Sequence, residues 1–173
     1  MQAPMYQGRA ALILLLIALG GLGLLLAIAV FLMRGRVIRL RVPARFESIR
    51  WLAVFVDELA REAQLGERAA FQCRLALDEA CTNIIEHAYA GNPAGEIEAC
   101  IRAGRGVCTI RLTDFGEPYD PTDVAPPPQP GRLDDVTPGG LGLYLMRTVM
   151  DDVRYTPSPR GNRLVMVKRR HRE

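Results

Sequence analysis

Residues 75–89, with the sequence LALDEACTNIIEHAY, decide the fold of this chain. At about 3.6 residues per turn they predict a helix in which an apolar stripe runs beside a polar row. The stripe is formed by Leu77, Cys81, Ile84, Ile85 and Ala88. The row is formed by Glu79, Asn83 and His87, each four residues after the one before. A carboxylate, an amide and an imidazole in this order can hold a metal ion and a proton acceptor against one ligand, although a solvated helix face has the same spacing.

The residues on either side of this stretch predict further elements. Residues 37–42 have the composition of a strand that ends at Pro43. A helix follows from Ser48 to about residue 65, where Gly66 stops it. The central helix is expected from residue 67 to residue 90, and two strands, 96–102 and 107–114, then form a hairpin.

The second strand of this hairpin ends in an acid. Cys108, Ile110, Leu112 and Asp114 share one face, because side chains alternate along a strand. A carboxylate buried on that face without partners would cost several kcal/mol. We therefore expect Asp114 either to lie at an exposed strand end or to accept hydrogen bonds from a specific partner. The chain leaves the sheet at Gly116, where backbone can approach a ligand closely.

Residues 116–140 contain seven of the twelve prolines of the chain and almost no periodicity. A loop of this length inside a compact domain is usually a lid, a binding loop or a disordered segment, and we expect a lid because the loop ends in a glycine-rich turn. Gly139, Gly140 and Gly142 lead into a helix, so backbone N–H groups and the positive helix end are free to receive a phosphate. The turn is not a Walker A loop, since that motif needs a lysine and the only lysine of the chain is Lys168.

Two short strands, 153–155 and 163–167, complete the folded part. The whole pattern predicts an α+β fold in which a mixed, mostly antiparallel sheet carries helices on one face.

The first part of the chain has a different composition. Residues 10–33 contain no charged side chain, and as a helix they would span roughly 36 Å against a hydrocarbon core of about 30 Å. One arginine precedes this segment and a cluster of arginines follows it. This asymmetry predicts a single-pass helix in the inner (cytoplasmic) membrane, with the N-terminus outside and the folded domain in the cytoplasm. A cleaved signal peptide and a buried soluble helix remain alternatives.

The predicted organisation therefore has four parts. They are a short tail (1–9), a transmembrane helix (10–33), a basic juxtamembrane segment with the first strand (34–45) and a folded domain (37–170) with its lid (116–140). The juxtamembrane arginines are candidates for contact with anionic lipid headgroups.

Charge and cysteine content exclude some functions. The sequence pI is about 8.8, but residues 51–173 hold 15 basic and 18 acidic residues, a net charge of −3. The folded part shows no basic stripe, so direct binding to nucleic acid is not expected. The four cysteines have no C-x-x-C spacing, which favours buried reduced thiols, and with two histidines a structural zinc site is not expected.

Three stretches together resemble the anti-sigma-factor serine/threonine kinases, a branch of the GHKL ATPases, which have the Bergerat fold. EACTNIIEHAY (79–89) matches the N-box of that branch in order and spacing. DFGEPYDP (114–121) matches its first glycine box, and GGLGL (139–143) matches its second. The resemblance covers about residues 37–170, and the predicted membrane segment lies outside it.

The resemblance implies roles for the matching residues. Asn83 would coordinate the Mg²⁺ that bridges the phosphates of ATP, and Glu79 would accept the proton of the attacking hydroxyl group. Asp114 would bind the adenine amino group, with Gly116 making room for it. Further nucleotide contacts would come from His87 and from the second glycine box, Gly139, Gly140, Leu141, Gly142 and Leu143.

The chain departs from the family pattern at two places. Pro118 replaces a glycine often found in the first box, and the lid lacks a lysine that could reach the γ-phosphate. Arg132 is a candidate substitute for that lysine, with a solvated loop arginine as the alternative. These departures concern the rate of catalysis more than nucleotide binding.

The function implied by the resemblance is that of a membrane-tethered, ATP-dependent serine/threonine kinase. It would phosphorylate a small anti-sigma-factor antagonist of the STAS type and could also sequester a sigma factor. Arg50 lies near the start of a helix, where the helix dipole disfavours a cation, so it is a candidate partner contact, with a solvated arginine as the alternative.

Two alternatives and one question of assembly stay open. The chain could be an ATP-gated binding module without phosphotransfer. It could also be the ATPase part of a histidine kinase, although His87 and His171 are its only histidines and neither lies on a helix ahead of the domain. The membrane helix and the first strand are candidate contacts in a homodimer.

Overall fold

The computed structural model describes residues 35–118 and 140–171. The predicted tail (1–9), the predicted transmembrane helix (10–33) and most of the predicted lid (119–139) lie outside the described residues. Within the described ranges, no helix is long and apolar enough to cross a membrane. The chain from Arg36 onward forms a compact unit of its own.

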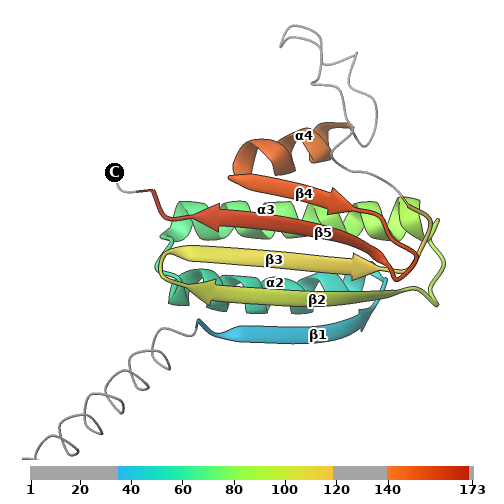
Figure 1. Cartoon of the computed structure of the whole chain (residues 1–173), viewed down its shortest axis with the longest axis horizontal. Coiled ribbons are helices and arrows are strands. Elements are labelled where there is room, and N and C mark those ends of the chain that lie inside the picture. Colours follow the sequence, from blue (N-terminus) through green and yellow to red (C-terminus); the bar gives the residue numbers. More distant parts are fainter. Residues whose placement is uncertain (1–34, 119–139, 172–173) are drawn as a thin grey trace, which may run out of the picture. The chain divides into compact units, whose positions relative to one another are not determined.

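Three helices and a π turn lie on one face of a five-stranded sheet (Figure 1). In chain order the elements are β1 (Val37–Pro43), α2 (Phe46–Glu62), α3 (Glu67–Asn83), η1 (Ile84–Ala88), β2 (Glu96–Gly104), β3 (Val107–Asp114), α4 (Gly140–Val149), β4 (Asp152–Thr156) and β5 (Asn162–Arg169). The strand order is β1-β2-β3-β5-β4. The predicted α+β class is confirmed.

The sheet corrects one detail of that prediction. All four strand pairings among the described residues are antiparallel, so the expectation of a mixed sheet is wrong. For β2–β3 and β4–β5 the physical reason is the connectivity, because each pair is a tight hairpin and a parallel pair would need a longer crossover. The first helix, α2, also begins two residues earlier and ends three residues earlier than predicted.

The core lies between the sheet and the helices. Alternate residues of β2 and β3, such as Ile97, Ile101 and Ile110, are buried on the face that packs against α2, and β5 packs against α3. The apolar stripe predicted for the central helix is confirmed, because all five of its side chains are buried. The hydrophobic residues of the core belong to residues 44–166, so the folded unit has its own core.

The central helix differs from the prediction at its C-terminal end. It is α-helical only to Asn83, and η1 continues it as a π turn in which the N–H of Tyr89 bonds to the carbonyl of Ile84, five residues back. The wider turn rotates the later side chains relative to an α-helical path. The predicted row of Glu79, Asn83 and His87 therefore does not continue as one α-helical face, and His87 is exposed whereas Asn83 is buried.

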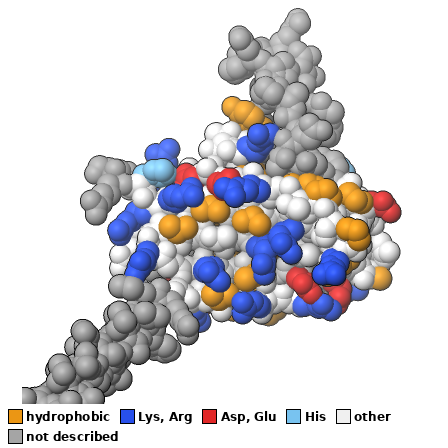
Figure 2. Space-filling view, in the orientation of Figure 1, with side chains coloured by type: hydrophobic (Ala, Val, Ile, Leu, Met, Phe, Trp, Pro, Cys, Tyr) orange, Lys and Arg blue, Asp and Glu red, His pale blue; other side chains and the backbone are white. Residues whose placement is uncertain are grey.

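The other face of the sheet, which we call the open sheet face, is basic. By strand pairing and alternation it carries Arg39, Arg41, Arg102, Arg111, Arg154, Arg163 and Arg169, together with the acids Glu96, Glu98 and Asp152. Seven arginines and three acids give it a formal charge of +4. Figure 2 looks onto this face and shows Lys and Arg side chains spread over it. The expectation that the folded part has no basic stripe is wrong, because these arginines are far apart in sequence and only strand pairing gathers them.

Candidate functional site

Asp114, the acid at the end of β3, is 5% exposed and lies on the core side of the sheet. Its Oδ1 accepts hydrogen bonds from Asn162 Nδ2 at 2.9 Å and from the backbone N–H of Gly116 at 3.1 Å. Burial raises the pKa of Asp114, and these two hydrogen bonds oppose the rise. The expectation that this carboxylate has a specific partner is confirmed, and one of its two oxygens accepts both of these hydrogen bonds.

The partner of Asp114, Asn162, was missed by the sequence analysis. It is the first residue of β5, is 2% exposed and lies directly opposite Asp114 in the strand register. The signal was present: Asn162 heads the inward row that continues with Leu164 and Met166. The predicted strand began one residue later, at Arg163, so this row was not extended to its polar end.

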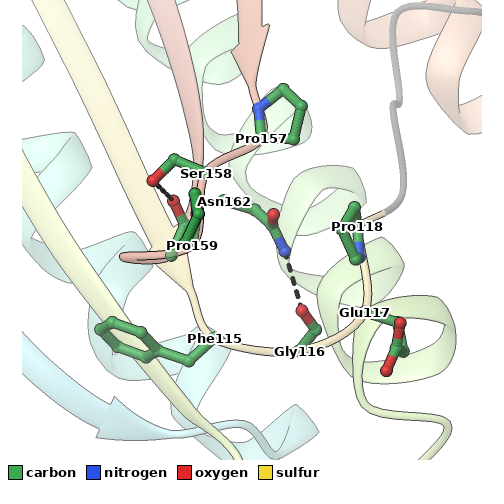
Figure 3. Close-up of a pocket in the computed structure, with 9 residues that line it drawn as sticks. Phe115, Gly116, Glu117, Pro118, Pro157, Ser158, Pro159 and Asn162 are labelled. Atoms are coloured by element: carbon green, nitrogen blue, oxygen red, sulfur yellow. Dashed lines mark hydrogen bonds between the residues drawn. The ribbon is translucent and has the colours of Figure 1, made fainter.

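Gly116 is positioned where no larger residue fits. Its carbonyl oxygen accepts a second hydrogen bond from Asn162 Nδ2, at 3.0 Å, as Figure 3 shows. A Cβ atom at this position would lie 2.2 Å from the carbonyl oxygen of Ala88, at the end of η1. The next residue, Glu117, donates its N–H to the same carbonyl oxygen at 2.9 Å. The first glycine box is therefore joined directly to the end of the N-box helix.

Asn83, the last residue of α3, is 7% exposed, and its Nδ2 is buried without a hydrogen-bond partner. A buried amide atom left in this state costs about 1–3 kcal/mol. A half-turn of the amide exchanges its nitrogen and oxygen, so the vacant position suits either a donor or an acceptor. An unsatisfied buried amide of this kind marks a position where a ligand can supply the missing contact.

One small cavity joins the two polar residues. It is lined by Ala80, Asn83, Ile84, Ala88, Asp114, Tyr155 and Leu164 and has a volume of about 20 Å³. This volume suits an ordered water molecule and not a purine. Binding of a base here therefore requires the lining side chains to move apart.

A larger cavity of about 500 Å³ lies on the other side of the Asp114 and Asn162 pair. Residues 115–118 form one wall, and Pro157, Ser158, Pro159, Gly161 and Asn162 form the other (Figure 3). Figure 3 shows the Asn162 side chain directed toward Gly116 across this space. Asp114 lines the small cavity and Asn162 lines the larger one, so the hydrogen bond between their side chains lies between the two.

Glu79 lies one helical turn before Asn83 and is partly exposed. Burial raises its pKa, and the neighbouring carboxylates of Asp78 and Glu86 raise it further. A carboxylate with a raised pKa is a better proton acceptor than an ordinary surface glutamate. His87, the third member of the predicted row, is exposed on η1.

Tyr89, at the end of the N-box, holds three elements together. Its hydroxyl donates to the carbonyl of Glu96 at 2.8 Å and accepts the N–H of Phe115 at 2.9 Å. It therefore connects the end of the helix to the start of β2 and to the exit of β3. This residue fixes the distance between the two boxes without lining the small cavity.

The second glycine box lies at the start of α4. Gly140 is the first residue of this helix, and Leu141, Gly142 and Leu143 belong to its first turns, whereas Gly139 lies outside the described residues. In Figure 1 the N-terminal end of α4 is on the same side of the domain as the end of β3 and as η1. All three sequence boxes therefore meet at one side of the fold.

Arg50 lies on α2 and does not belong to this group of site residues. It is exposed on α2, beside Trp51, which is 70% exposed. An exposed arginine next to an exposed tryptophan is consistent with a partner contact, which remains a prediction.

The donor set fits a nucleotide with Mg²⁺. Mg²⁺ is usually held by one or two protein oxygens together with phosphates and water, and a half-turn of the Asn83 amide would bring its oxygen to the position of the unsatisfied Nδ2. Within residues 35–118 and 140–171, no three His, Cys, Asp or Glu side chains come together that could hold a metal ion by themselves. The residues present therefore suit a metal ion that arrives with phosphate ligands.

Comparison with known proteins defines the class. The model of the histidine kinase-like ATPase domain family matches residues 42–168. The match covers all three sequence boxes, and the chain belongs to this family.

Characterised relatives define the branch within that class. The chain is 35% identical over 121 residues to the serine/threonine-protein kinase BtrW of Bordetella bronchiseptica, covering 69% of this chain and 82% of the relative. It is 30% identical over 121 residues to the serine-protein kinase RsbW of Bacillus subtilis, covering 68% and 76%. The resemblance to the anti-sigma-factor serine/threonine kinases is confirmed, and the chain is a protein serine/threonine kinase of the RsbW and BtrW type.

A solved structure supports the fold alone. The crystal structure of the RsbU and RsbW domains of Rv1364c from Mycobacterium tuberculosis superposes with a TM-score of 0.53 at 16% identity. It covers 78% of this chain and 32% of the other chain.

Proposed function

We propose that this kinase is anchored in the membrane and transfers phosphate from ATP to a Ser or Thr of a small anti-sigma-factor antagonist of the STAS type. The observation that carries the proposal is the meeting of the buried Asp114 and the unsatisfied Asn83 around one cavity, at the side of the fold where α4 begins. Relatives named RsbW and BtrW support the assignment to protein phosphorylation.

Asp114 would select the base. Its carboxylate would accept a hydrogen bond from the adenine amino group, and Asn162 and Gly116 fix its orientation through Oδ1. A carboxylate held in this way rejects a base that lacks a donor at that position, because its buried oxygen would be left unpaired.

Asn83 and the start of α4 would hold the phosphate end. The Asn83 amide would coordinate Mg²⁺, and the backbone N–H groups of residues 139–143 would receive the phosphates at the helix N-terminus. ATP supplies the phosphoryl group, and Mg²⁺ neutralises its charge. His87, Leu141 and Leu143 are further proposed nucleotide contacts.

Glu79 would act as the proton acceptor. Phosphoryl transfer depends mainly on positioning and on charge neutralisation, and the protein must also remove the proton of the attacking hydroxyl. Glu79 lies one turn from Asn83 and has a raised pKa, which suits it for this task.

Anchoring is proposed from the sequence of residues 10–33. A single-pass helix there, with the kinase domain on the cytoplasmic side, follows from the uncharged segment and the arginines behind it. A sigma factor is proposed as a second partner, with Arg50 as a candidate contact.

Transfer from ATP to a serine-containing antagonist of the same genome tests the proposal. With Mg²⁺ present we expect phosphate on the antagonist, and Glu79→Gln should reduce the transfer rate by roughly 10²- to 10⁴-fold. Glu67→Gln is a matched control, since Glu67 is exposed in the first turn of the same helix and does not contribute to the raised pKa of Glu79, and it should leave the rate unchanged. Full transfer by Glu79→Gln would refute the role of this residue. A nucleotide-dependent complex without any transfer by the wild type would instead identify a binding module.

A further inference from the structure

The open sheet face has more positive charge than its own acids neutralise. Arg41 pairs with Glu96 and Glu98, and Arg154 pairs with Asp152. These contacts engage all three acids of the face. The remaining five arginines, Arg39, Arg102, Arg111, Arg163 and Arg169, form no ion pair with another residue of the described part of the chain.

The helix layer on the opposite side has the opposite charge. Residues 46–90 and 140–149, which form α2, α3, η1 and α4, contain eight acidic side chains and five arginines, a net charge of −3. The domain is therefore electrically two-sided, with its positive side on the sheet (Figure 2). Such a distribution orients a protein against a surface of one charge sign.

The start of the domain is close to the proposed membrane helix along the chain. Only Arg34 and Gly35 separate residue 33 from Arg36, a distance of at most roughly 11 Å for an extended chain. Arg36 is itself fixed to α2, because its Nη1 lies 2.6 Å from both Glu58 and Glu62. If residues 10–33 span the membrane as proposed, this short connection keeps Arg36 close along the chain to the end of the span.

The open sheet face begins where this short connection ends. Val37, the first residue of β1, lies on that face opposite Arg102. The candidate nucleotide site is at the other end of the strands, since Asp114 pairs with Ile97 next to the end of β1. A flat contact through the open sheet face would therefore leave the nucleotide site accessible.

We propose that the open sheet face docks on the anionic lipid surface of the membrane that holds residues 10–33. The proposal rests on the membrane anchoring proposed above. A second copy of the chain is a poor occupant, because two faces of charge +4 repel each other. The cytoplasmic leaflet is negatively charged and attracts each nearby arginine with roughly a fivefold gain in partition.

Vesicle partition of residues 36–173 tests the docking without the membrane helix. This segment is a compact unit with its own core. The probes are phosphatidylcholine vesicles, either pure or with roughly one phosphatidylglycerol in three lipids. We expect the segment to bind the anionic vesicles only. This binding should be lost at an ionic strength of about 1 M, where the Debye screening length falls to about 3 Å.

Charge reversal identifies the face. Arg102→Glu with Arg163→Glu removes two exposed arginines of the open sheet face and should reduce partition by at least about 25-fold. The neutral pair Arg102→Gln with Arg163→Gln should give a smaller loss. The matched control, Arg61→Glu with Arg68→Glu, makes the same charge change on the exposed helix layer and should reduce partition much less.

Each contrary result overturns the docking. Absence of binding to anionic vesicles would exclude it and leave an acidic protein as the partner of this face. An equal loss in both charge-reversed pairs would show attraction by net charge without a defined face. Membrane anchoring is measured separately, by alkaline extraction of the full chain from membranes, so its failure is distinguishable from failure of the docking.

Discussion

The two ends of the β3–β5 strand pair each carry a buried polar side chain, and they differ in how completely that side chain is bonded. At one end Lys168, 7% exposed, donates from Nζ to the carbonyl of Val149 at 2.7 Å and to Asp151 Oδ1 at 3.4 Å. At the other end Asp114, 5% exposed, accepts the hydrogen bonds of Gly116 and Asn162 on one oxygen, and the amide nitrogen of Asn83 beside it is unsatisfied.

The difference separates a structural contact from a binding site. Asp151 also accepts hydrogen bonds from the backbone of Arg169 and contacts His171 Nε2 at 3.0 Å. The Lys168 end is therefore well bonded and fixes the turn between α4 and β4. The Asp114 end keeps bonding capacity next to a cavity, which in a native protein is met by a water molecule, an ion or a ligand. The following variants test this contrast.

Apart from Asp114 itself, the largest effect is expected at Asn83. In Asn83→Ala the proposed Mg²⁺ ligand is lost, so the affinity for Mg-ATP should fall by about a hundredfold, near the upper end of losses at metal sites. The fold should keep its stability, because the variant also removes a buried unsatisfied atom. Titration with ATP, with and without Mg²⁺, measures the effect. Gln72→Ala, an amide change on the same helix, is the control.

The next effect concerns stability alone. Lys168→Met keeps the apolar stem but leaves the Val149 carbonyl without its donor. We expect a loss of about 1–3 kcal/mol in the free energy of unfolding. Urea unfolding measures this loss, and ATP affinity should not change. A large drop in affinity would contradict the separation of the two ends.

A smaller effect is expected at Asn162, which positions Asp114. Asn162→Leu removes the hydrogen bond that opposes the raised pKa of Asp114. ATP affinity should fall by roughly tenfold, and the pH below which binding is lost should move upward. A structural role alone would lower affinity without this pH shift. Ser158→Ala, in the turn before β5, is the control, since its hydroxyl bonds only within the turn.

The two ends should also respond differently to acid. Burial raises the pKa of Asp151, but the bonds from His171, Arg169 and Lys168 outweigh it, so the pKa is lowered below 3.8. Its stabilising contribution is therefore present above that value and is lost as the pH falls below it. Asp114 has a raised pKa and takes up a proton at higher pH. Stepwise acidification should weaken ATP binding before it lowers the melting temperature, and the reverse order would contradict the assignment.

The sequence predicted the parts of this site that depend on local periodicity. The apolar stripe from Leu77 to Ala88 and the inward position of Asp114 follow from helix and strand spacing alone. Gly116 was expected from its place after the strand. These features require no knowledge of which strands pair.

Features that depend on pairing between distant segments were missed. Asn162 is 48 residues from Asp114, and only the β3–β5 register places the two side chains together. The open sheet face is basic for the same reason, since its arginines come from all five strands. The π turn at η1 was also missed. Its backbone hydrogen bonds span five residues where those of an α-helix span four, and the spacing of apolar residues in the sequence does not reveal this difference.

The most direct test of the central claim is calorimetric titration of Mg-ATP into residues 36–173 and into the Asp114→Asn variant of the same segment. We predict a clear binding heat for the wild type and an affinity at least about a hundredfold lower for the variant, with nearly the same melting temperature. Equal affinities, or no heat with the wild type, would contradict the assignment of this end of the sheet as the nucleotide site.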